Sequence, residues 1–114
     1  MARKANVTYD AENDILWAST GEKVKESLEI DSFILDLSQA DAVIGVEILD
    51  ASKVLAKMLS RPMGKETLAS IQSASISLYQ GKELSFVVLK LSFPTPAGPE
   101  ELPVQIPAPR AALA

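Results

Sequence analysis

The spacing of apolar residues changes at one position in the first half of the chain. Residues 44–49 alternate with period two, which is typical of a strand with one strongly apolar face. Further on, the apolar positions Val54, Leu55, Met58 and Leu59 recur at helical spacing. Asp50 stands between the two patterns, and its carboxylate can accept the free amide hydrogens of a first helical turn. The sequence therefore predicts a strand followed by a helix of roughly nine to ten residues that ends near Ser60.

Shorter alternating segments precede this strand, at residues 5–9, 15–19, 24–30 and 33–37. The Asp- and Asn-rich residues between the first two segments predict a hairpin loop of about five residues. The charged segment 24–30 suits an exposed or edge strand. Together these patterns predict an antiparallel sheet of about four strands that leads into the helix.

The second half predicts another hairpin. Serine alternates with apolar residues over 73–78, residues 80–83 form a turn with a glycine, and 84–93 is a long apolar strand. Two inward-facing sets are compatible with that last strand: Leu84, Phe86 and Val88, or Val87, Leu89, Leu91 and Phe93. Because both faces are apolar, we expect one to be covered by the helix and the other by a second subunit.

Six of the seven prolines lie between residues 94 and 109. Proline cannot donate to a ladder, so a central strand is excluded there. Leu102, Val104 and Ile106 still alternate, which favours an extended edge segment docked on the sheet or on a neighbouring chain over a loose polyproline-like tail. The predicted fold class is α+β in a single domain over residues 1–114. A β-meander of about four strands and one helix occupy residues 1–60, and a second hairpin with a proline-rich edge segment occupies residues 61–114.

The chain contains no histidine and no cysteine. Serine triads, Cys-His dyads, disulfides and thiolate metal sites therefore have no residues to build them. No catalytic, cofactor-binding or metal-binding residue is predicted, and the leading expectation is a protein that is not an enzyme. A cytoplasmic location is expected, because no apolar run is long enough for a membrane span and none follows the basic start of the chain.

Charge is unevenly distributed. Residues 1–60 carry six Lys or Arg against eleven Asp or Glu, whereas residues 61–114 carry five against four. An acidic first half repels phosphate backbones, so binding to nucleic acid is not expected. A basic protein is the better candidate partner.

Three groups of residues are candidates for chemistry or recognition. Asp36, Glu47 and Asp50 belong to an acidic series, and the strand patterns place Asp36 and Glu47 on the outer, solvated face of the sheet. Trp17 has two possible roles, a core pair with Tyr9 on the neighbouring strand or an interface contact. Residues 64–67 echo the end of a phosphate-binding loop, but the glycine required five positions earlier is replaced by leucine.

Several segments of the first sixty residues resemble the DUF2283 family of small prokaryotic proteins of unknown function. The segments are Val7–Asp10, Asp14–Trp17, Phe33–Asp36 and, most specifically, Ile44–Ser52. The resemblance implies a compact antiparallel meander followed by a helix, with no established activity and no catalytic residues to carry over. It also implies a loose association with toxin–antitoxin-type gene pairs. The chain departs from the family pattern at residues 39–42 and after residue 60.

The leading functional prediction is a non-catalytic interaction module that self-associates, most simply as a dimer. One alternative is an antitoxin-like companion that binds a basic protein partner. Another is a carboxylate-dependent hydrolase or metal-assisted enzyme, in which Asp36, Glu47 or Asp50 would converge in a concave pocket. The candidate interface residues are Trp17, Val87, Leu89, Leu91, Phe93, Val104 and Ile106.

Overall fold

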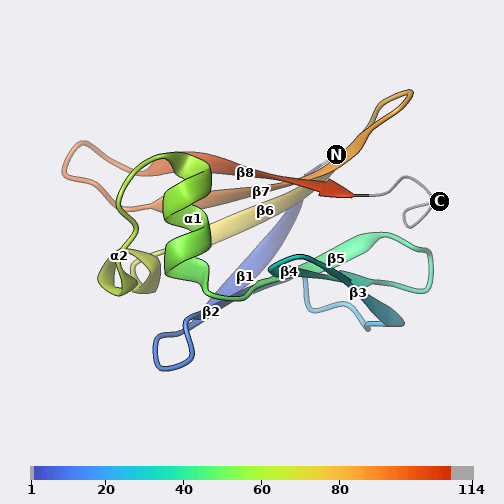
Figure 1. The fold of residues 1–114 in the computed structure, drawn as a ribbon, viewed down its shortest axis with the longest axis horizontal. Helices are drawn as coiled ribbons and strands as arrows, with labels where there is room; N and C mark the ends of the chain where they lie inside the picture. Colours follow the sequence, from blue (N-terminus) through green and yellow to red (C-terminus); the bar gives the residue numbers. More distant parts are fainter. Residues whose placement is uncertain (1, 109–114) are drawn as a thin grey trace.

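The computed structural model describes residues 2–108, which form eight strands and two short helices (Figure 1). The strands are β1 (Arg3–Asp10), β2 (Ile15–Ser19), β3 (Glu26–Ile30), β4 (Phe33–Leu37), β5 (Val43–Ile48), β6 (Ser73–Gln80), β7 (Ser85–Phe93) and β8 (Glu100–Ala108), and the helices are α1 (Ala51–Leu59) and α2 (Lys65–Ala69). Neither helix has the length or apolar character that would let it cross a membrane.

β1 joins the two halves of one antiparallel sheet, because its two ends pair with different neighbours. Residues 6–10 pair with β2, and residues 3–5 pair with β6. The strand order is β3-β4-β5-β2-β1-β6-β7-β8. β5 nevertheless contacts β6, although two strands stand between them in that order. The sheet is therefore curved into a half-barrel, and α1 lies against β8 (Figure 1).

The predicted fold class is wrong, since the structure is not an α+β meander followed by one helix and a separate hairpin. It is mostly antiparallel β structure in one continuous eight-stranded sheet, with α2 as a second helix that the sequence pattern did not predict. The pairing of residues 3–5 with residues 74–76 makes the sheet continuous. This pairing joins segments distant in sequence, and no local alternation of apolar residues encodes such a partner.

Several local predictions are confirmed. β5 leads into α1, which ends at Leu59 before Ser60 in a left-handed conformation. β3 lies at one edge of the sheet, and β8 docks on β7 at the other edge. Residues 109–114 of the proline-rich segment lie outside the described residues. The open question about 84–93 is also answered, because the set that begins with Val87 faces inward.

One hydrophobic core occupies the inner face of the sheet. It combines residues from both halves, including Leu16, Val46, Leu89 and Ile106, all fully buried. α1 adds the buried Leu55 and contacts β8. Strands β1–β5 and strands β6–β8 of the one sheet therefore share a single core, which is why neither half of the sheet needs a second copy to cover its inner face.

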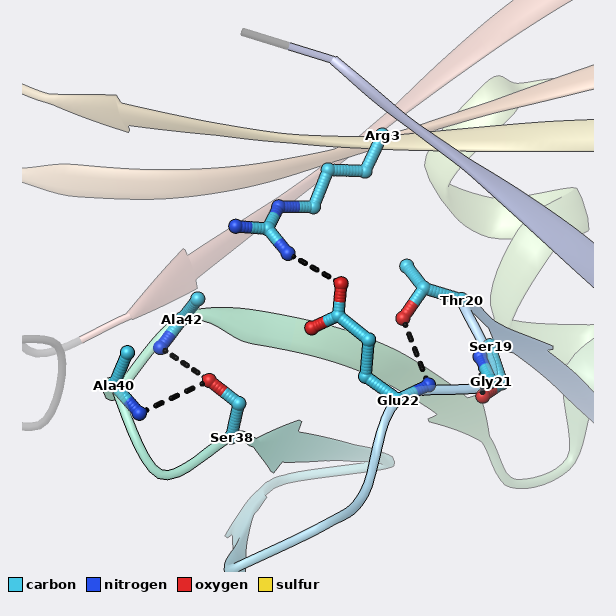
Figure 2. Close-up of polar contacts among 8 residues, drawn as sticks. All are labelled: Arg3, Ser19, Thr20, Gly21, Glu22, Ser38, Ala40 and Ala42. Carbon is cyan, nitrogen blue, oxygen red and sulfur yellow. Dashed lines mark hydrogen bonds and ion pairs between the residues drawn. The ribbon is translucent and has the colours of Figure 1, made fainter.

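The loops at the end of the sheet near Arg3 are closed mainly by local contacts. Figure 2 shows the Ser38 hydroxyl accepting hydrogen bonds from the backbone N–H groups of Ala40 and Ala42, each at 3.3 Å. Arg3 also forms an ion pair at 2.8 Å with Glu22 in the loop between β2 and β3. Both partners of this pair are nearly half exposed, so it contributes about 0–1 kcal/mol to stability.

A candidate binding hollow around Trp17

A shallow hollow lies on the outer face of the sheet around Trp17 of β2. In the strand register, Trp17 stands between Thr8 of β1 and Glu47 of β5. These three residues line a hollow of about 360 Å³ together with Asp10 and Ile15. Trp17 is 43% exposed, a large fraction for the chain's single tryptophan. The hollow therefore offers an indole ring to solvent between two acidic side chains.

The register rules out the expected core pair between Trp17 and Tyr9. Tyr9 stands opposite Leu16, on the inner side of the sheet, whereas Trp17 stands opposite Thr8 on the outer side. Successive residues of a strand point to opposite faces, so the one-residue offset separates the two aromatic rings. The structure therefore excludes the core pair between Trp17 and Tyr9. The interface role of Trp17 stays a prediction.

Asp36 accepts a hydrogen bond from the indole ring of Trp17. Its Oδ2 accepts the Trp17 indole N–H at 3.4 Å, which is a long hydrogen bond, and its Oδ1 accepts the Ser27 hydroxyl at 2.7 Å. The carboxylate lies over Gly45, where a Cβ atom would come within 2.6 Å of Oδ2. Asp36 is only 8% exposed, so the prediction that it is solvated is wrong. The missing side chain at Gly45 provides the space in which this outward-facing carboxylate is buried.

A second carboxylate, Asp14, ties the β1–β2 turn to the start of α1. It accepts the Tyr9 hydroxyl at 2.7 Å, the Ser52 hydroxyl at 2.7 Å and the Ser52 backbone N–H at 3.0 Å. Asp50 has a left-handed backbone, with φ 50°, and its side chain makes no capping hydrogen bond. The capping role expected for Asp50 is therefore filled by Asp14, from a loop distant in sequence.

The hydrogen bonds of this cluster shift two pKa values. Burial acts to raise the pKa of Asp14, but the hydrogen bonds from Ser52 and Tyr9 outweigh it and hold that pKa below its usual value. Burial, followed by the hydrogen bond to Asp14, raises the pKa of Tyr9 to about 12. At neutral pH, Asp14 is thus a charged carboxylate that accepts hydrogen bonds from a neutral tyrosine and from the N-terminus of α1.

The rim of the hollow is acidic. The hydrogen bonds from Asn13 hold the pKa of Asp10 below its usual value, so Asp10 is charged at neutral pH. Glu47 is half-buried and has no ion pair or side-chain hydrogen bond with any residue of the range 2–108. Lys65 of α2 acts on Asp10 electrostatically from further away. The hollow therefore combines the aromatic ring of Trp17 with the unpaired carboxyl group of Glu47 and the charged carboxylate of Asp10. This combination suits a cation.

The remaining predicted interface residues lie elsewhere. They are buried on the inner face within one copy of the chain, each at most 4% exposed: Val87, Leu89, Leu91, Phe93, Val104 and Ile106. These side chains belong to the chain's own core, together with residues of β2, β4, β5 and α1. Of the predicted set, Trp17 alone is at the surface.

The three carboxylates considered for catalysis do not converge. Asp36 is hydrogen-bonded to the Trp17 indole, Glu47 lines the hollow, and Asp50 is exposed at the start of α1. Within residues 2–108, no group of three or more acidic side chains is arranged to hold a metal ion. Residues 64–67 form the start of α2 and not a loop that opens a longer helix.

A larger and more polar hollow, of about 430 Å³, lies where β1 leaves β6. Lys4, Ser75 and Lys90 share one row of the outer face there, and Glu101 also lines the hollow. The serine alternation of residues 73–78 marks this face in the sequence, but no pattern connects it to Lys4 of β1.

The residues that build the Trp17 hollow all fall within one stretch of the chain that resembles known sequences. Residues 6–52 match DUF2283. The family is described as a protein of unknown function, and the resemblance expected from the sequence is confirmed for this stretch. The DUF2283 segment includes the five hollow residues, the Asp36–Gly45 contact and the Asp14–Ser52 contact.

Two curated relatives match the chain. An uncharacterized protein of Methanocaldococcus jannaschii is 40% identical over 52 residues, which is 45% of this chain and 45% of that protein. A Methanosarcina mazei protein named "Putative hypoxanthine phosphoribosyltransferase" is 31% identical over 85 residues, which is 74% of this chain and 64% of the relative. The chain thus spans less than two thirds of either relative. The comparison with solved structures gives no match.

Proposed function

We propose that this chain is a non-catalytic interaction module that self-associates by pairing the open edges of two β3 strands. The observation that carries the proposal is the difference between the two edges of the sheet. Among residues 2–108, β3 and β8 each have one side without a neighbouring strand, and of these two strands only β3 keeps all its backbone N–H donors.

The β8 edge is poorly suited to pairing. Pro103 and Pro107 lie in β8 while it is paired with β7, and proline is tolerated in an edge strand where its nitrogen faces away from the partner. The residues at odd positions of β8 therefore direct their backbone toward the open side. Two of these positions have no N–H, which leaves few donors for an added strand.

The β3 edge allows a specific register. A two-residue turn joins β3 to β4, and Asp31 in that turn has φ 54°, as a tight hairpin turn requires. The closing pair of such a hairpin exchanges both hydrogen bonds, so Ser27 and Glu29 direct their backbone groups outward. Two antiparallel β3 strands centred on Leu28 would place Ser27 of one copy opposite Glu29 of the other. No glutamate then stands opposite a glutamate.

We propose binding in place of the transferase activity in the name of the Methanosarcina mazei relative. A transferase that handles phosphorylated substrates needs an anion site, and the N-terminus of a helix is a common one. In this chain the Asp14 carboxylate already accepts the backbone N–H of Ser52 at the start of α1. Because the Asp14 carboxylate occupies the N-terminus of α1, this helix end supports the fold and is not offered to a phosphate group.

The test uses two matched proline variants of the full chain. Glu29→Pro removes an outward N–H from β3, and Gln105→Pro removes one from β8 between the natural prolines. Size-exclusion chromatography with light scattering should give a dimer for the natural chain and for Gln105→Pro, and a folded monomer for Glu29→Pro. A natural chain that stays monomeric at high micromolar concentration would end the proposal, as would a Glu29→Pro dimer.

A second candidate function is the binding of a basic protein partner, as an antitoxin-like companion would do. The acidic rim of the Trp17 hollow favours it, because it adds a shaped surface to the general negative charge of the first half. Purification of the tagged chain from its native host tests this candidate. Recovery without a basic partner in stoichiometric amount would contradict it.

A further inference from the structure

We infer that the Trp17 hollow is a binding site for the guanidinium group of an arginine side chain presented by a basic protein partner. The inference goes beyond self-association, because the hollow lies on the outer face of β1, β2 and β5 and leaves the β3 edge free.

The exposed indole ring provides the first element of such a site. A cation over the face of a tryptophan is attracted by the negative charge of the ring, and a planar guanidinium also stacks on it. The hydrogen bond from the indole N–H to Asp36 fixes one edge of the ring. Asp36 is in turn held by Ser27 and seated over Gly45, so the ring is oriented before any ligand arrives.

Glu47 provides the second element. It is the cross-strand neighbour of Trp17, and side chains that stand directly opposite on one face have Cβ atoms about 4.5–5.5 Å apart. A guanidinium on the indole ring is therefore within reach of the Glu47 carboxyl group. The fork of N–H groups on arginine matches a carboxylate with two parallel hydrogen bonds, which a lysine ammonium cannot make.

The rest of the hollow suits the arginine stem. Ile15 and Thr8 line it, and the methylene groups of arginine pack on apolar surface while the charged end stays near solvent. Asp10 adds a second negative charge at the rim. The volume of about 360 Å³ is at the small end of ligand pockets, which fits one side chain of a partner.

The single tryptophan makes the site directly observable. Titration of the folded Glu29→Pro variant with a tetra-arginine peptide should produce a saturable change in Trp17 fluorescence, whether or not two natural copies pair. Tetra-lysine should bind several-fold more weakly, and added salt should weaken both peptides. Because this variant lacks the proposed dimer contact, the outcome is independent of the self-association test.

Two substitutions locate the binding. Glu47→Gln should weaken tetra-arginine binding by about fivefold to tenfold, because it removes the carboxylate that would pair with the guanidinium. Glu83→Gln, in the exposed turn between β6 and β7, removes the same charge away from the hollow and should leave the affinity unchanged. Circular dichroism should show that both variants keep the fold.

Three results would overturn the inference. They are an unchanged Trp17 fluorescence at saturating tetra-arginine, equal weakening by the Glu47 and Glu83 substitutions, and equal affinity for tetra-lysine and tetra-arginine. The last result would indicate general charge attraction with no recognition of the guanidinium group.

Discussion

The DUF2283 segment and the β6–β8 sheet share a core but are held together differently. In the first region, two carboxylates organise the structure: Asp14 joins a turn to a helix, and Asp36 joins β2, β3 and β4 across Gly45. In the second region, β6 alternates serines with apolar residues and β7 buries every second side chain, while the buried hydroxyl of Ser85 has no hydrogen-bond partner among residues 2–108. Both regions depend on apolar burial, and the first adds specific polar contacts to it.

This difference predicts different responses to pH. Apolar burial does not change with proton concentration, whereas a carboxylate that accepts hydrogen bonds loses them when it is protonated. Substitutions in the two regions should therefore be separable by measuring the free energy of unfolding at more than one pH.

The largest effect is expected from Leu89→Ala in β7. Leu89 is fully buried in the shared core, and truncation of a buried leucine to alanine costs about 2–5 kcal/mol through lost burial and a residual cavity. Urea unfolding followed by Trp17 fluorescence should show this loss, and the loss should be similar at pH 7 and pH 3. A loss below about 1 kcal/mol would mean that β7 contributes little to the common core.

A smaller but pH-dependent effect is expected from Asp14→Ala. The substitution leaves the Tyr9 hydroxyl and the Ser52 N–H without their acceptor, which should cost about 2 kcal/mol at pH 7. Because the pKa of Asp14 is lowered in the folded protein, its contribution is complete above the unfolded value of about 3.9. It is lost as the pH falls through the lowered folded value.

The difference between the natural chain and Asp14→Ala should therefore shrink as the pH falls below about 4. Chemical unfolding of both proteins at pH 7 and at pH 3 measures it, with Leu89→Ala as the control that does not shrink. A difference that stays constant over this range would show that Asp14 acts through packing and not through its charge.

The smallest effect is expected from Gly45→Ala, at about 1–2 kcal/mol. The new Cβ would lie 2.6 Å from Asp36 Oδ2 and must displace the carboxylate that accepts the Trp17 indole N–H. The same substitution in an Asp36→Ala background should cost less, because the clashing atom is gone. Urea unfolding of the natural chain, the two single variants and the double variant gives the coupling free energy between Gly45 and Asp36. Additive losses of stability would contradict the proposed contact.

The sequence predicts individual elements here better than it predicts their assembly. Alternation at residues 44–49 and helical spacing after Asp50 correctly predicted β5 and α1. The charged segment 24–30 correctly predicted an edge strand. The alternation of residues 33–37 placed Asp36 on the correct face but could not show that Gly45 makes room to bury it. An isolated glycine inside a strand is a signal of close approach, and it was the one available clue to this site.

The N-terminus of α1 shows a different kind of error. Asp50 has the residue type and position of a helix cap, yet its backbone is left-handed and its side chain makes no cap. Asp14 fills that role from 38 residues away in the sequence. Local propensity identified the helix start correctly but could not identify the residue that stabilises it.

The sequence by itself determined the strands, the first helix, the absence of histidine and cysteine chemistry, and the sites of the two edges. These features depend on side-chain periodicity and residue type, which are local properties of the chain. Tertiary structure alone decided that β1 pairs with β6, that the core closes within one copy, and that Trp17 faces outward beside Glu47. Those outcomes depend on contacts between distant segments, which are selected by how the whole sheet buries its apolar face.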